Sequence, residues 1–233
     1  MIEIENVVLP SDDQWFAVIR GMRNPLESWH KIDSERYEYH ADNTVVMSKF
    51  ELGKNDLSLM KRLVKAGKDH SKFMRMIPVY LDIIAPLYFY KEVDTYKVGT
   101  VCNSCSTMHK IHAKEFTLDD FSTEHLNRRT LETLESTIDD LNRYRELYLH
   151  GGRDYISDSD DKDYEPKNKD IWWQMIQLLP SSYNQRRTIM LNYEVLANMY
   201  KSRKNHKLDE WNEFCKWIET LPYSKLITQK GES

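Results

Sequence analysis

The stretch LPSSYNQRRTIMLNYEVLANMYKSR, residues 179–203, carries the strongest signal for the fold. We predict a single helix from near Ser182 to Arg203 within it. On such a helix Asn192 and Arg203 are eleven residues apart and point within roughly 20° of each other, while Asn198 lies roughly 120° from Asn192. Asparagine lowers helix propensity. The two asparagines therefore either form a second, solvent-exposed polar face or bind a ligand with amide-like edges, while Arg203 binds an anion.

The segments around this stretch predict a helix-rich α+β protein. Residues 157–170 contain six acidic residues and almost no apolar ones, which predicts a mobile surface loop at about 153–170. The remaining elements are predicted from apolar spacing and turn residues: a mixed lead-in over 1–50, helices at 55–67, 117–149 and 208–220, a strand at Ile77–Ala85 and a helix after Pro86.

Composition narrows the class of protein. The chain has 233 residues, 40% of them apolar and 30% charged, which is typical of a globular protein, and we predict one domain over 1–233. A net charge of −4 argues against nucleic-acid binding. The sequence has no apolar run of 18 residues and no signal-peptide pattern at its start, so we expect no membrane span and a cytoplasmic location.

A cluster of thiols and imidazoles at residues 102–112 has part of the pattern of a metal site. Cys102 and Cys105 have the spacing of zinc ligands, and His109 and His112 follow closely. Structural zinc patterns usually separate the two ligand pairs by a dozen residues or more, whereas these four residues fall within eleven positions. We therefore predict no metal site and favour ordinary thiols and imidazoles over zinc.

Two blocks of sequence resemble the flavin-dependent thymidylate synthases. The first comprises LVKAGKDHSKF at 63–73, the strand and Ala85-Pro86 step, and residues 91–109, which stand where the family has Arg-Gln-x-x-Arg-His-Arg and Ser-x-Asn-Glu-x-Ser-x-Arg-Tyr. The second comprises Leu179-Pro180, the two asparagines, Arg203 and Asp209-Glu210-Trp211. The chain departs from the motif: Thr95-Tyr96-Lys97 replaces Arg-His-Arg, and Ile176 replaces a substrate-binding arginine. Ser104 and Met108 replace a glutamate and an arginine.

The resemblance implies a fold, a reaction and a set of roles. The fold would have a central, mostly antiparallel sheet packed by long helices. The reaction would transfer a methylene or methyl group to dUMP, as in nucleotide biosynthesis, with FAD as cofactor and methylenetetrahydrofolate and NADPH as co-substrates. Flavin sites would be shared between the chains of a homotetramer. By resemblance, the FAD-binding residues would be His70, Tyr96, Lys97, Asn192 and Asn198, the substrate-binding residues Glu92, Ser104, Ser106 and Arg203, and the catalytic residues Ser106 and Arg203.

Three functions follow from these observations. The first is a divergent methyltransferase of pyrimidine nucleotides that uses reduced flavin. The second is a non-catalytic homologue, either a nucleotide- or flavin-binding protein or an assembly protein, which loss of the Arg-His-Arg triplet favours. The third is a zinc-binding module built on the cysteine and histidine cluster. Lys91, Lys110, Arg186 and Arg187 are candidates to replace the lost arginines.

Overall fold

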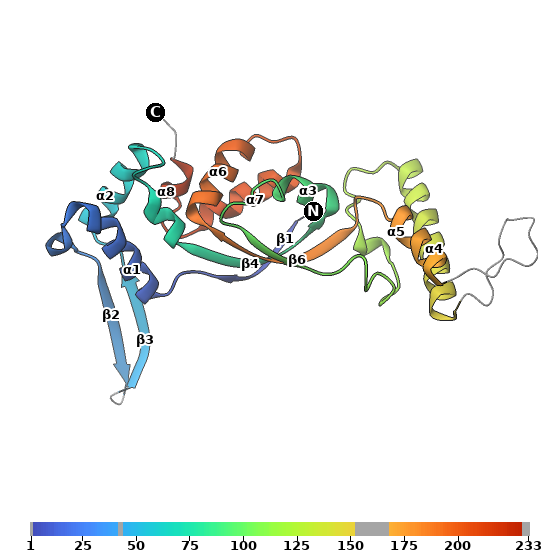
Figure 1. The fold of residues 1–233 in the computed structure, drawn as a ribbon, viewed down its shortest axis with the longest axis horizontal. Coiled ribbons are helices and arrows are strands. Elements are labelled where there is room, and N and C mark those ends of the chain that lie inside the picture. Colours follow the sequence, from blue (N-terminus) through green and yellow to red (C-terminus); the bar gives the residue numbers. More distant parts are fainter. Residues whose placement is uncertain (1, 42–43, 152–167, 230–233) are drawn as a thin grey trace, which may run out of the picture. The chain divides into compact units, whose positions relative to one another are not determined.

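The computed structural model describes residues 2–41, 44–151 and 168–229, and Figure 1 shows their arrangement into helices and strands. Most of the predicted acidic loop at 153–170 lies outside the described residues; its last residues begin a helix. The main elements are β1 (Glu3–Val8), α1 (Asp12–Arg23), β2 (Glu35–Ala41), β3 (Thr44–Glu51), α2 (Lys54–Lys65), β4 (Pro78–Pro86), α3 (Leu87–Val93), β5 (Val101–Ser104), α4 (Arg128–Leu149), α5 (Asn168–Leu178), β6 (Asn184–Asn192), α6 (Tyr193–Arg203), α7 (Asp209–Thr220) and α8 (Lys225–Thr228).

The strands form two sheets. One has four strands in the order β1-β4-β6-β5, and the other is the antiparallel pair β2 and β3. The predicted class is confirmed: the chain is a helix-rich α+β protein with a mostly antiparallel sheet. Its residues divide into two compact units, one containing 83–93 and 103–187, the other 4–82, 94–102 and 188–233. Strands β4 and β6 contribute residues to both units, and the single domain over 1–233 stays a prediction.

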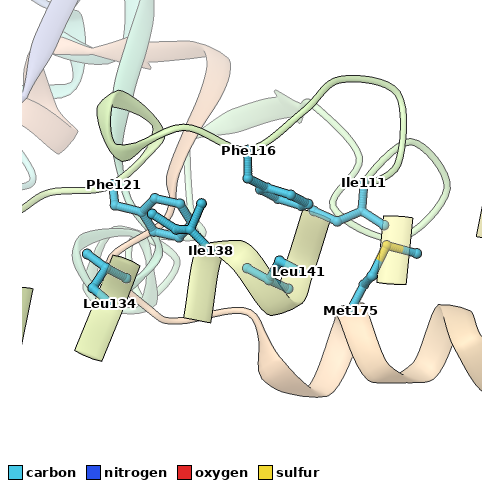
Figure 2. Packing of buried hydrophobic residues seen from close by; sticks show 7 residues of the cluster. All are labelled: Ile111, Phe116, Phe121, Leu134, Ile138, Leu141 and Met175. Carbon is cyan, nitrogen blue, oxygen red and sulfur yellow. The ribbon is translucent and has the colours of Figure 1, made fainter. Parts of the chain in front are cut away.

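The first unit is built around α4 and α5. Figure 2 shows its core, which consists of Ile111, Phe116, Phe121, Leu134, Ile138, Leu141 and Met175. The helical apolar spacing predicted over 117–149 is thereby confirmed for α4 at Leu134, Ile138 and Leu141. The predicted start at 117 is wrong, because the side chain of Asn127 accepts a hydrogen bond from the Thr130 amide at 3.1 Å and caps the helix there.

The second unit contains a buried ion pair that joins α1 to α2. The Arg23 Nε donates to Asp56 at 2.6 Å, and the two side chains are 3% and 0% exposed. The other carboxylate oxygen of Asp56 accepts from the Ser34 amide and hydroxyl at 3.1 and 2.6 Å. Asp33 accepts from the first amides of α2 and thus holds the start of that helix.

The predicted helix from Ser182 to Arg203 is wrong in its first half. Residues 184–192 form strand β6, in which Gln185, Ile189 and Leu191 are buried, and only 193–203 form the helix α6. Strand spacing places alternate residues on one face. Asn192 consequently does not lie three helical turns from Arg203, and it stands instead at the junction of strand and helix.

Candidate functional site

The start of α6 is fixed by Asn192. Its side-chain oxygen accepts from the Val195 amide at 3.0 Å and caps the helix, while its Nδ2 donates to the Gly99 carbonyl at 3.4 Å. Gly99 has a φ of +80°, and a Cβ there would lie 2.8 Å from that Nδ2. Only glycine fits such an approach in this backbone conformation. Both edges of the Asn192 amide are therefore used within the chain.

A cavity of about 180 Å³ opens beside this junction. It lies within the second unit and is lined by Lys68, Arg75, Val98, Gly99, Asn192, Glu194, Val195 and Asn198. Asn198 is exposed on α6, and within the described residues its amide forms no side-chain hydrogen bond. Lys68 and Arg75 are also exposed and form no ion pair there. The cavity thus offers two cations, one amide and the buried carboxylate of Glu194 to a ligand.

The sequence indicated the two asparagines but not the two cations. Lys68 and Arg75 lie on either side of His70-Ser71, in a segment between α2 and β4 that is more than a hundred residues from α6. Nothing in their local spacing connects them to Asn198. His70 and Lys97 are exposed as well, and neither is among the residues that line this cavity.

Arg203, at the end of α6, is held by aromatic residues. Its Nε donates to the Tyr96 hydroxyl at 3.1 Å, and its guanidinium carbon lies 5.0 Å from the centre of the Trp211 ring. The distance from Nη1 to the His206 ring nitrogen is 3.2 Å. A cation over aromatic rings is attracted to their faces. Tyr96 and Arg203, to which the resemblance gives separate roles toward FAD and substrate, are therefore in contact within the second unit.

Ser106 lines a larger cavity of about 640 Å³ in the first unit. Its hydroxyl accepts from the amides of Met108 and His109 at 3.3 and 2.8 Å, which holds the turn after β5. Lys110 and Arg186, two of the four candidate replacements for the lost arginines, line the same cavity. Burial, followed by the charge of Asp120, raises the pKa of the lining Tyr183, so its hydroxyl stays protonated.

The other two candidate cations lie elsewhere in the first unit. The guanidinium of Arg187 stacks 3.9 Å from the centre of the Tyr90 ring, and Lys91 is exposed on α3. Of the remaining predicted substrate residues, Glu92 is half-buried on α3, and Ser104 is exposed at the end of β5. Neither lines the Ser106 cavity.

The zinc alternative gains no support from the geometry. In the part of the chain that the structure describes, no group of three or more His, Cys, Asp or Glu side chains could hold a metal ion. The His112 ring instead packs against Tyr148, with the ring centres 4.7 Å apart.

Comparison with solved structures defines the class of fold: the chain has the fold of the flavin-dependent thymidylate synthases. One solved structure, flavin-dependent thymidylate synthase ThyX from Helicobacter pylori complexed with FAD and dUMP, matches with a TM-score of 0.61 and 16% identity over 98% of this chain and 99% of that chain. A second structure of that enzyme with FAD and dUMP matches equally well over 100% of both chains. The predicted resemblance is thereby confirmed at the level of the fold.

The match to this fold comes from structure, because comparison of sequences identifies no relative. No protein-family model matches the chain, and no curated protein does so either. Among the described residues, no helix is both long and apolar enough to cross a membrane.

Proposed function

We propose that this chain is a thymidylate synthase-like flavoprotein that binds FAD and a pyrimidine nucleotide, dUMP, and transfers a one-carbon group to it. The observation that carries the proposal is the cavity beside α6, where Asn198 stands near the cations Lys68 and Arg75. The shared fold supports it, since the solved ThyX structures from H. pylori are complexed with FAD and dUMP.

Lys68, Arg75 and Asn198, which line this cavity, offer groups that can bind part of FAD. Cationic side chains bind phosphate oxygens, and an amide offers both a donor and an acceptor to a flavin ring or its ribityl chain. Sites for whole ligands of drug size measure about 300–1,000 Å³. A cavity of about 180 Å³ therefore holds only a portion of the cofactor. We accordingly propose that a second copy of the chain completes the site, as in a homotetramer.

The nucleotide is assigned to the Ser106 cavity, whose volume of about 640 Å³ falls in the range for a complete ligand. Lys110 and Arg186 supply positive charge for its phosphate, and Ser106 supplies a hydroxyl. When bound, FAD supplies the hydride chemistry, while the protein contributes position and charge. Methylenetetrahydrofolate and NADPH are proposed as the one-carbon donor and the reductant. Arg203 is proposed to bind an anionic group of the substrate.

One observation favours the second function, a flavin- or nucleotide-binding homologue without turnover. Arg203 already packs over Trp211 and donates to Tyr96, the residue that stands in the middle of the missing Arg-His-Arg triplet. A guanidinium committed to aromatic partners within its own chain has less freedom to neutralise charge that develops on a substrate.

FAD binding is tested first, with purified full-length protein. We expect flavin absorption bands, or quenching of flavin fluorescence when FAD is added. The variant K68A/R75A should weaken FAD binding at least tenfold, because it removes both cations of the cavity. The control K72A/K201A removes two exposed lysines that do not line it and should leave binding unchanged. Equal binding by the two variants would exclude the cavity as a flavin site.

Turnover separates the two functions. Flavin is reduced anaerobically by NADPH, and its reoxidation is followed with and without dUMP and methylenetetrahydrofolate. Reoxidation that depends on dUMP, with formation of a methylated nucleotide, identifies the enzyme. FAD and dUMP binding without reoxidation identifies the non-catalytic homologue, and a protein that binds neither ligand refutes both.

A further inference from the structure

A strongly basic groove lies between α2 and α8, which are side by side in the second unit (Figure 1). Its volume is about 600 Å³, and none of its lining residues is acidic. The lining comprises Lys54, Leu57, Ser58, Lys61, Arg62, Val64, Lys65, Lys225, Leu226 and Gln229. Half of these ten residues are cations, in a chain whose net charge is −4. The groove is distinct from the cavities beside α6 and Ser106.

The cations are arranged on one side of α2. At about 100° per residue, Lys54, Lys61 and Lys65 fall within roughly 40° of one another and span about 16 Å along the helix axis. Within the described ranges, none of the five cationic side chains in the groove takes part in an ion pair. The only acid in α2 is Asp56, which is buried and paired with Arg23.

Helix stability does not explain this arrangement. Lysines four residues apart, such as Lys61 and Lys65, repel each other. Lys54 is the first residue of α2, where the helix dipole disfavours a cation. Only Arg62 and Lys65, in the last turn, are placed favourably with respect to that dipole. The local repulsion is relieved when an anion lies in the groove.

The groove also has an apolar wall. Val64 and Leu226 are 5% and 1% exposed, and Leu57 is half-buried beside them. A volume of about 600 Å³ is that of a site for a small molecule. The occupant therefore combines several negative charges, spaced along the lysines, with a body that packs on aliphatic side chains. A single phosphate lacks the length, and a bare polyphosphate lacks the apolar part.

We propose that the groove between α2 and α8 binds a nucleoside di- or triphosphate. The phosphates lie along Lys54, Lys61 and Lys65, and the base packs against Leu57, the half-buried apolar residue of the lining. This site is independent of the FAD and dUMP sites proposed above, because it shares no lining residue with either cavity.

The test is calorimetric titration of the full-length protein with ATP, tripolyphosphate and adenosine. ATP should bind most tightly and tripolyphosphate at least fivefold more weakly, and adenosine should give no measurable heat. The variant K61E/K65E should weaken ATP binding at least tenfold. The control K201E/K216E reverses two exposed lysines outside the groove and should change it less than twofold. K61A/K65A preserves helix propensity and should give a loss of the same direction.

Three results would overturn the proposal. The first is equal ATP affinity in K61E/K65E and the control, which would place any ATP at another site. The second is tripolyphosphate binding as tight as ATP binding, which would leave the apolar wall without a role. The third is affinity for single-stranded oligothymidine that rises with its length and is lost in K61E/K65E, which would identify a nucleic-acid surface. Because FAD titration of these variants should be unchanged, failure here leaves the proposed function untouched.

Discussion

Asn192, which caps α6, and Asn198, which lies within α6, should respond differently to substitution. Both line the cavity, but the Asn192 amide is bonded within the chain, whereas Asn198 makes no side-chain hydrogen bond in the described residues. Asn192 is 8% exposed and caps the helix, so Asn192→Ala removes the cap and the bond to Gly99. Loss of an N-cap costs about 0.5–2 kcal/mol. The second hydrogen bond, at 3.4 Å, is long and adds at most about 0.5 kcal/mol. We therefore expect the free energy of unfolding to fall by about 0.5–2.5 kcal/mol.

Asn198→Ala should give the opposite pattern. Asn198 is exposed and makes no side-chain hydrogen bond in the described residues, and alanine has the higher helix propensity. Stability should stay the same or rise by up to about 0.7 kcal/mol. If its amide contacts FAD, loss of one hydrogen bond of about 0.5–1.5 kcal/mol weakens binding about twofold to thirteenfold.

Urea denaturation followed by circular dichroism measures the first quantity, and FAD fluorescence quenching measures the second. Asn192→Ser is the matched control because serine also caps helices, and it should recover most of the stability that alanine loses. A wild-type midpoint for Asn192→Ala would refute the capping argument. Unchanged FAD affinity in Asn198→Ala would remove this residue from the proposed cofactor site.

Asp56→Asn should lower the free energy of unfolding by about 3–5 kcal/mol, because it leaves a buried guanidinium without its counter-ion; a loss below about 1 kcal/mol in urea denaturation would contradict this. Backbone hydrogen bonds outweigh the opposing effect of burial and lower the pKa of Asp33. Its stabilising contribution should therefore be present above the ordinary aspartate pKa of 3.8 and be lost as the pH falls below it. Asp33→Asn should flatten this acid-side loss of stability, and an identical pH profile would exclude the role. Burial raises the pKa of Cys215 to about 11, while Cys102 and Cys105 are exposed. A thiol reagent at pH 8 should therefore modify two cysteines quickly and the third only after unfolding, and three equally fast reactions would show that Cys215 is accessible.

The elements that could be predicted from the sequence are those in which the apolar residues repeat throughout at either the helical or the strand spacing. The helix predicted at 208–220 is confirmed as α7, Asp209–Thr220, with Trp211, Phe214 and Ile218 buried, although the short helix α8 follows it. The strand predicted before Pro86 is confirmed as β4. Strand β6 was mistaken for helix because its buried face begins with the polar Gln185. Only Ile189 and Leu191 show alternation there, which is too short a signal to outweigh the helical spacing that follows.

The candidate site could be predicted only in part, because its residues come from distant segments. The resemblance indicated Asn198 and Ser106, each of which lines a cavity. It did not single out Lys68, which lies within the 63–73 block, or Arg75, and both residues reach the cavity through the fold. The basic groove was also missed, since Lys225 joins the lysines of α2 only through tertiary packing.

The contact between Gly99 and Asn192 has a consequence for how this sequence varies. A side chain at position 99 would collide with the amide at position 192, and that amide in turn caps α6. A smaller capping residue at 192, such as serine, would remove this collision, but the φ of +80° at position 99 would still disfavour any residue other than glycine. Among natural variants of this chain, we therefore expect glycine to be retained at 99 wherever asparagine caps α6 from 192, although 93 residues separate the two positions.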